Sequence, residues 1–258
     1  INSMYMKYLF FALLFLAFHG IQAQTSGSIT YEEKMDLHRN LPPDRQDLKD
    51  MIPQYNSTLF ELTYNGDESI YRAKKQEEMP PVTSTTQSPP GGPGGPMRWG
   101  GGRATRVVYK NLAQDTMIDS RDFMQKQFLI TGPPKARKWK IGTKQKEILG
   151  FNCLEASFVA DTATTIVAWF SPQLPISNGP SDYQGLPGMI LQIDVNNGER
   201  MITATEISQD SVDTSVIVAP NKGKEVTPEE FEKIREEKMK EMGMQGGPGG
   251  PQMYYMRH

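Results

Sequence analysis

Apolar and polar residues alternate along much of the chain, and this period of two is typical of β-strands with one buried face. The clearest case begins at Met189, where one face carries Met189, Leu191, Ile193 and Val195. Gln192 and Asp194 lie on the other face, which predicts a half-buried strand. The Asn-Asn-Gly sequence at 196–198 then predicts a hairpin whose second strand covers 199–207.

The same alternation predicts further strands over most of the chain. They cover residues 28–37, 57–63, 68–73, 105–111, 116–131, 138–143, 146–151 and 158–170. Within the two longest stretches we place turns at 119–122 and at 161–162. Residues 43–52 carry Leu48 and Ile52 at helical spacing and predict a short helix. Residues 24–226 are therefore expected to form one mainly β domain with an antiparallel sheet.

One internal stretch departs from this pattern. Residues 79–103 contain a Pro pair, a Ser/Thr run and the hexamer Gly-Gly-Pro-Gly-Gly-Pro at 91–96, with almost nothing to bury. This composition predicts disorder. Because the strand pattern resumes directly afterwards, we interpret the stretch as a loop inserted at a hairpin tip rather than a boundary between domains.

The C-terminal part predicts a helix and then a tail. Thr227-Pro228-Glu229-Glu230 is a capping box with proline at the first helical position, so a charged helix is expected within 227–243. Residues 244–258 repeat the Gly/Pro hexamer and are expected to be disordered.

The N-terminal residues 1–23 have the pattern of a signal peptide. Lys7 precedes an apolar run from Tyr8 to Phe18, and Ala23 offers a small residue for cleavage. The pattern predicts secretion across the inner membrane into the periplasm, with the cell exterior as the alternative. No other apolar stretch reaches the ~20 residues that a membrane-spanning helix needs, so the protein is not expected to span a membrane.

A short motif between two predicted strands indicates kinship. In Gly185-Leu186-Pro187-Gly188-Met189-Ile190-Leu191, Pro187 and Gly188 predict a rigid turn that leads directly into a strand. The string resembles the signature of the GLPGLI family, secreted proteins of Bacteroides-related bacteria, with Met189 in place of Leu. Gly150-Phe151-Asn152-Cys153-Leu154-Glu155-Ala156 is similar to a second family motif, GY-x-C-x-KA. The resemblance spans about residues 138–193.

This resemblance implies a fold but no chemistry. It implies a single curved antiparallel sheet, similar to the half barrels of periplasmic lipoprotein carriers. It brings no established catalytic residues and no assigned ligand. The function of this chain must therefore be argued from its own residues.

Composition argues against two classes of function. The chain carries 28 Lys and Arg against 30 Asp and Glu, which is too balanced to predict nucleic-acid binding. Cys153 is the single cysteine, and we expect it in the core because a reactive thiol needs a charged partner. After removal of the signal peptide only His38 and His258 remain, so we find no catalytic constellation and expect a protein that is not an enzyme.

Aromatic and apolar residues near the GLPG motif suggest a binding role. The candidate ligand-binding residues are Trp139, Trp169, Phe170, Tyr183, Leu186 and Met189. They could line the concave side of a curved sheet and hold a lipid, an extended peptide or an outer-membrane protein, or they could be the core of the sheet. An envelope scaffold that acts through the Gly/Pro segments is a further alternative.

Methionines flank both Gly/Pro hexamers and suggest one metal alternative. Met244, Met253, Met256 and His258 in the tail offer thioether and imidazole ligands that suit Cu(I). A loop with Met97 and Trp99 could close over such a site. Low-complexity tails also carry methionine without a metal. Apart from this copper hypothesis, no cofactor is predicted.

Overall fold

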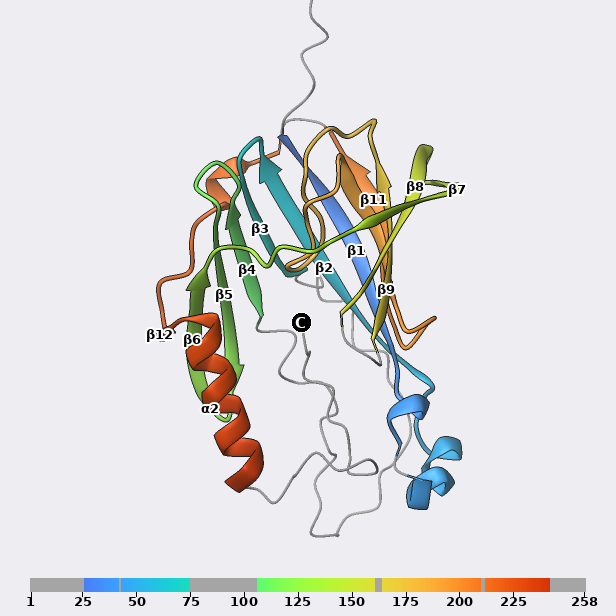
Figure 1. The fold of residues 1–258 in the computed structure, drawn as a ribbon, viewed down its shortest axis with the longest axis vertical. Coiled ribbons are helices and arrows are strands. Elements are labelled where there is room, and N and C mark those ends of the chain that lie inside the picture. The colour runs from blue at the N-terminus through green and yellow to red at the C-terminus, as the bar shows by residue number, and fades with distance from the viewer. Residues whose placement is uncertain (1–25, 42, 75–105, 161–163, 210–211, 242–258) are drawn as a thin grey trace, which may run out of the picture.

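In the part of the chain that the structure describes, the protein folds as one open, curled β-sheet with one α-helix packed on it (Figure 1). The computed structural model describes residues 26–41, 43–74, 106–160, 164–209 and 212–241. The sheet order is β12-β6-β5-β4-β3-β2-β1-β11-β10-β9-β8-β7. The predicted signal peptide, the Gly/Pro stretch at 79–103 and the tail at 244–258 lie outside the described residues.

The strands and helices have the following bounds. The first six strands are β1 Ser26–Asp36, β2 Tyr55–Asn65, β3 Glu68–Ala73, β4 Val107–Asn111, β5 Thr116–Phe123 and β6 Lys126–Gly132. The others are β7 Lys140–Ile148, β8 Phe151–Val159, β9 Thr165–Ser171, β10 Met189–Val195, β11 Arg200–Ser208 and β12 Lys224–Val226. The α-helix is α2 Pro228–Glu241, and the 3-10 helices are η1 His38–Asn40, η2 Pro43–Asp50 and η3 Thr214–Val216.

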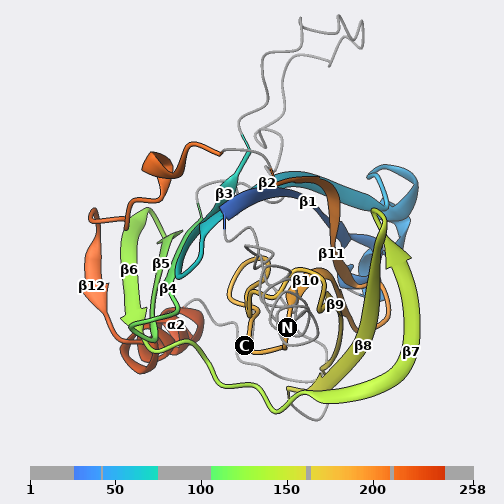
Figure 2. The ribbon, with the colours of Figure 1, turned by 90° about the horizontal axis from the view of Figure 1, so that it is seen from above.

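Strand β1 lies in the middle of the sheet and joins two antiparallel meanders. It pairs with β2 on one side and with β11 on the other. From β2 the chain proceeds strand by strand to β6, and from β7 it proceeds to β11. All pairs are antiparallel except β12 with β6. Figure 2 shows the sheet curling around its concave side without closing. The prediction of a mainly β, single curved antiparallel sheet with a C-terminal helix is confirmed.

The helix forms as its capping box predicts. The Thr227 hydroxyl accepts a hydrogen bond from the Glu230 amide at 3.2 Å, and the Glu230 carboxylate accepts one from the Thr227 amide at 2.9 Å. Phe231 is buried against Phe128 of β6, with ring centroids 5.3 Å apart. The helix thus covers β6 through a small apolar cluster of its own.

The prediction of a turn at 119–122 is wrong. Strand β5 continues through these residues, and the turn lies at Met124 and Gln125, which have φ of 49° and 63°. Asp and Ser favour turns when they are exposed, but Asp119 and Ser120 are buried in the strand. The Asp119 carboxylate is held there by Arg106, as described below.

Two further strand predictions need correction. Residues 138–143 and 146–151 were predicted as separate strands, but one strand, β7, runs through both and turns at Leu149 and Gly150. Residues 43–52, predicted as a short helix, contain the 3-10 helix η2 at Pro43–Asp50. Strand β10 is buried on both faces from Met189 to Ile193 rather than half-buried, because the preceding loop folds back onto Ile190.

Candidate functional site

The loop between β9 and β10, residues 172–188, occupies the concave side of the sheet; we call it the inner loop (Figure 2). Its side chains Leu174, Tyr183 and Leu186 are buried in the main core. The Asn178 carbonyl accepts a hydrogen bond from the Ile190 amide at 2.9 Å, and the Leu174 carbonyl accepts one from the Met189 amide at 2.9 Å. The loop therefore folds back along the start of β10.

Gly188 allows the inner loop to enter β10. Its φ of 149° is one that residues with a Cβ rarely adopt. A Cβ at this position would lie 2.2 Å from the Ser171 carbonyl oxygen, which is far inside van der Waals contact. The positive φ and the close approach of the Ser171 backbone are thus two separate reasons for glycine at this position of the predicted turn.

Lys110 of β4 anchors the inner loop from a part of the sheet that is distant from β9 and β10 in the strand order. Its side chain is fully buried, and its Nζ donates to Asn178 Oδ1 and the Gly179 carbonyl, both at 2.9 Å, and to the Tyr183 carbonyl at 3.1 Å. Burial lowers the pKa of Lys110 to about 7, although Asp182 opposes this shift. The three acceptors match the three hydrogens of an ammonium group, so the protonated form fits this position.

Asn178 extends the same anchor to β3. Its Nδ2 donates to the Ser69 hydroxyl at 2.9 Å, and its Oδ1 accepts from the Gly179 amide at 2.8 Å. The side chain of Asn178 is buried, as is that of Ser69. Two strands of the sheet, β3 and β4, therefore bind the inner loop at the same point.

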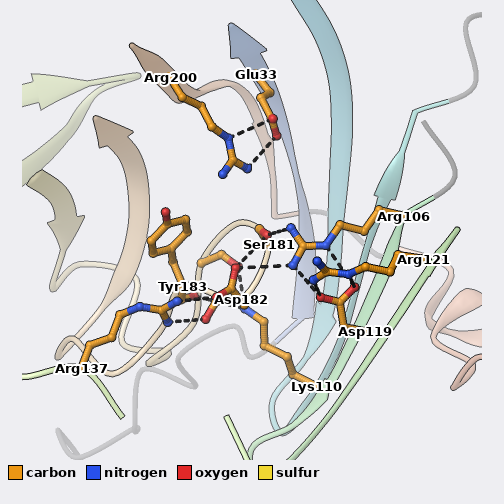
Figure 3. A network of polar contacts seen from close by, with 11 residues as sticks. Glu33, Arg106, Lys110, Asp119, Arg121, Arg137, Ser181, Asp182, Tyr183 and Arg200 are labelled. Carbon is orange, nitrogen blue, oxygen red and sulfur yellow. Dashed lines mark hydrogen bonds and ion pairs between the residues drawn. The ribbon is translucent and has the colours of Figure 1, made fainter. Parts of the chain in front are cut away.

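Arg106 connects the inner loop to β5. Its guanidinium donates to both carboxylate oxygens of Asp119, at 3.0 and 2.7 Å, and to the Ser181 hydroxyl at 2.7 Å (Figure 3). Burial alone would raise the pKa of Asp119, but Arg106 and Arg121 outweigh it and lower this pKa to about 2. Asp119 is therefore ionised and holds Arg106 in place.

Asp182 of the inner loop lies between two arginines. Arg106 Nη2 is 3.6 Å from Asp182 Oδ1, and Arg137 forms an ion pair with Oδ2. The Arg137 guanidinium also lies 4.6 Å from the ring centroid of Tyr183, a cation–π contact. Arg137 precedes β7, so this contact fixes the linker between β6 and β7 to the inner loop.

A separate buried pair joins β1 to β11. Arg200 donates to both carboxylate oxygens of Glu33, at 2.9 and 3.1 Å. Figure 3 shows this pair above the cluster around Asp182. Charged residues thus hold the inner loop against the concave side of the sheet. Arg106 and Arg137 bind oxygen atoms of the loop, and Arg106 also binds the carboxylate of Asp119 beside it. These buried polar contacts fix the inner loop to β3, β4, β5 and the β6–β7 linker.

Four of the six predicted ligand-binding residues are buried in the core, and the other two pack against it. Phe170, Tyr183, Leu186 and Met189 belong to the buried core. Trp139 and Trp169 pack against that core and keep partial exposure. Trp139 Nε1 donates to the Gln184 carbonyl at 3.0 Å, so Trp139 also holds the inner loop. Trp169 is instead covered by Lys146, whose Nζ lies 4.2 Å from the ring centroid.

Two other features singled out in the sequence are the Cys153 thiol and the proposed copper ligands of the tail. Cys153 is fully buried, and burial raises its pKa to about 11, although Lys146 opposes the shift. A thiol of this pKa is protonated at neutral pH. The proposed copper ligands Met244, Met253, Met256 and His258, with Met97 and Trp99, lie outside the described residues. Within the described ranges, no group of three or more His, Cys, Asp or Glu side chains is arranged to hold a metal ion.

The buried charges have a signal in the sequence, because they alternate with buried apolar residues. Arg106, Val108 and Lys110 alternate along one extended segment, so they share a face, and Val108 is fully buried. Glu33 likewise alternates with the buried Tyr31. Charged residues in phase with buried apolar ones predict ion pairs inside the sheet, although not their partners.

The chain is similar to known proteins in a short segment and in its fold. A family described as "Protein of unknown function (Porph_ging)" matches residues 159–192, which run from the end of β8 through the inner loop into β10. This match is consistent with the GLPGLI resemblance of the same segment.

A comparison with curated proteins finds no match. Among the described helices, none combines the length and the apolar character needed to cross a membrane.

Two crystal forms of PNGF-II share the fold of this chain at low sequence identity. One crystal form of PNGF-II superposes with a TM-score of 0.52 at 14% identity, over 81% of this chain and 33% of that chain. A second form gives 0.51 at 14% identity, over 81% and 32%. An uncharacterized conserved protein from Thermus thermophilus gives 0.39 at 7% identity, over 84% and 98%. This chain thus spans about a third of the length of PNGF-II, with which it shares a fold.

Proposed function

We propose that this protein is a non-catalytic binding protein of the cell envelope that holds a partner protein on the outside of its sheet. The inner loop carries this proposal. A carrier with a curved sheet would hold an apolar ligand on the concave side, and here residues 172–188 lie on that side. The chain's own Leu174, Tyr183 and Leu186 fill the space that cargo would need.

Opening the concave side would break several buried polar contacts at once. Lys110 would lose three acceptors, and Arg106 would lose Ser181 and Asp182. Each buried polar group left without a partner costs about 1 to 3 kcal/mol. A ligand that displaced the inner loop would have to offset all of these costs, which favours a binding surface elsewhere on the molecule.

The chemistry of the buried residues supports a non-catalytic role. The charged groups on the concave side act on one another and on the inner loop, and the Cys153 thiol has a raised pKa. Residues 1–23 carry the pattern of a signal peptide, which supports a place in the envelope. A secreted protein with a filled interior and an open sheet is suited to hold another protein.

The proposal is tested by photo-crosslinking in cells. The full chain would be expressed in a Bacteroides-related host with a diazirine side chain at one position at a time. Lys144, Leu59 and Lys224 sample exposed positions on β7, β2 and β12, and Leu186 samples the interior. We expect a discrete protein adduct from an exposed position and none from Leu186. A lipid adduct at Leu186, or no protein adduct at any exposed position, would contradict the proposal.

A further inference from the structure

Strand β7 forms one end of the sheet. Within the described part of the chain it pairs with β8 alone, and Figure 2 shows it at the end of the curled sheet. Its other edge therefore carries main-chain N–H and C=O groups that face away from the sheet. Pairing with β8 is irregular between Ile141 and Gln145 and regular from Gln145 to Ile148. An edge of this kind is a template on which another extended chain can pair.

The edge strand lies in a strongly basic part of the sequence. Residues 123–146 contain seven Lys and Arg and no Asp or Glu, and the one acidic residue of β7 is Glu147, near the end of the strand. The exposed members on and beside β7 are Lys135, Lys138, Lys140 and Lys144. Glu155 of β8 forms an ion pair with Lys144 at 3.0 Å. Ile141 stands among these lysines with 56% of its surface exposed. The edge therefore offers cations around one exposed apolar side chain.

These lysines disfavour pairing of β7 with a second copy of itself. An antiparallel pair centred on Lys144 would place this residue opposite its own copy, and like charges directly opposite each other destabilise a sheet. Lysine on an edge strand commonly prevents such association. The same lysines attract a strand of opposite charge, so the edge favours an acidic segment.

We propose that β7 binds an extended acidic polypeptide segment by adding it to the sheet as a further strand. The main chain of β7 supplies the pairing, Lys140 and Lys144 select Glu or Asp side chains, and Ile141 contacts an apolar residue of the segment. This inference rests on the proposed function, because it names the surface on which the partner lies and the charge that the partner carries.

Binding is measured by fluorescence anisotropy with the full chain as secreted. The probe is a fluorescein-labelled decapeptide that alternates Glu and Val. One control probe carries Lys in place of Glu, and another carries an N-methyl group on every main-chain amide of the acidic peptide, so that neither edge can donate hydrogen bonds. We expect only the unmodified acidic probe to bind, and its affinity to fall as salt is raised. Equal binding of the N-methylated probe would overturn strand addition, because that probe cannot pair.

Matched variants locate the binding edge. Lys140→Glu with Lys144→Glu should weaken binding of the acidic probe by about tenfold or more, because both charges that select it are reversed. Lys222→Glu with Lys224→Glu makes the same change of charge at exposed positions beside β12, and it should leave affinity within about twofold. Amide hydrogen exchange in β7 should slow when the probe binds. Equal affinity in both double variants, or unchanged exchange in β7, would overturn the inference.

The two proposals fail in different ways. If Lys224 or Leu59 gives protein adducts in cells while β7 binds no acidic probe, the edge inference fails and the proposed function stands. If the probe binds β7 but no exposed position gives a protein adduct in cells, the edge binds acidic strands and the proposed function fails.

Discussion

Arg106 and Asp119 form a bidentate ion pair beside the inner loop, and the same guanidinium donates to Ser181 within that loop. Asp119 also pairs with Arg121, whose guanidinium lies 5.5 Å from the ring centroid of Phe231 in α2. A continuous series of contacts thus runs from the C-terminal helix through the sheet to the inner loop. The loop is held by residues that are distant from it in sequence.

Removing the Lys110 ammonium should destabilise the protein strongly. Lys110→Met removes one donor from each of three buried acceptors, of which Asn178 Oδ1 keeps the Gly179 amide, and we expect a loss of about 2 to 4 kcal/mol in the free energy of unfolding. Urea unfolding followed by fluorescence measures this loss. Lys126→Met, at an exposed position of β6, is the control and should change stability by no more than about 0.5 kcal/mol. Similar values for the two variants would show that Lys110 does not anchor the loop.

The protein should lose stability in acid through Asp119. The folded-state pKa of this carboxyl is about 2, below its ordinary value, so its ionised form stabilises the fold above about pH 4. This contribution, about 2 kcal/mol, is lost as the pH falls from 4 toward 2. Urea unfolding at a series of pH values should therefore give a shallower pH dependence for Asp119→Asn than for the native protein. Asp122→Asn, which changes an exposed carboxyl of the same strand, should keep the native slope.

Two tyrosine hydroxyls in the core should behave differently. Tyr31 Oη donates to the Ile190 carbonyl at 2.7 Å, whereas the buried Tyr71 hydroxyl has no hydrogen-bond partner among the described residues. Tyr71→Phe should therefore leave the free energy of unfolding unchanged or raise it by up to about 1 kcal/mol. Tyr31→Phe should lower it by about 1 to 2 kcal/mol, since a buried carbonyl loses its donor. A larger loss for Tyr71→Phe than for Tyr31→Phe would contradict this assignment.

Gly188 should be essential to the fold, and Gly198 should not. Gly188→Ala places a Cβ 2.2 Å from the Ser171 carbonyl oxygen, so we expect a loss of at least about 3 kcal/mol or failure to fold. Gly198→Ala also strains a positive φ, of 93°, but its Cβ meets nothing within 4 Å, and it should cost about 1 to 2 kcal/mol. Thermal and urea unfolding compare the two. A tolerated Gly188→Ala would show that the loop enters β10 by another path.

The Cys153 thiol should be protected from reagents in the native protein. It is fully buried, and burial raises its pKa to about 11, so both access and thiolate formation are suppressed. We expect a disulfide reagent such as DTNB to modify Cys153 slowly in buffer and rapidly in urea. Rapid modification of the native protein at neutral pH would contradict the burial of this thiol.

Local sequence patterns are sufficient for several elements. The β10–β11 hairpin follows from alternation and from the Asn-Asn-Gly turn, where Asn196 and Asn197 adopt positive φ. The capping box at Thr227 fixes the start of α2. Both depend on residues that are close in sequence, which is why they can be predicted.

Elements that depend on distant partners could not be predicted. Asp119 was assigned to a turn because Asp and Ser favour turns, whereas Arg106, just before β4, and Arg121 hold its carboxylate buried in β5. The inner loop contains the GLPG motif, but its place on the concave side depends on Lys110 and Arg137 from other elements. Candidate ligand-lining residues such as Tyr183 became part of the core for the same reason.

Native mass spectrometry of the protein purified from the envelope of a related host tests the central claim most directly. If the inner loop fills the concave side, the protein should carry no lipid or other small apolar ligand, and its native mass should equal the mass of the polypeptide alone. A stoichiometric lipid adduct, lost on denaturation, would show that the concave side holds cargo and would contradict the account.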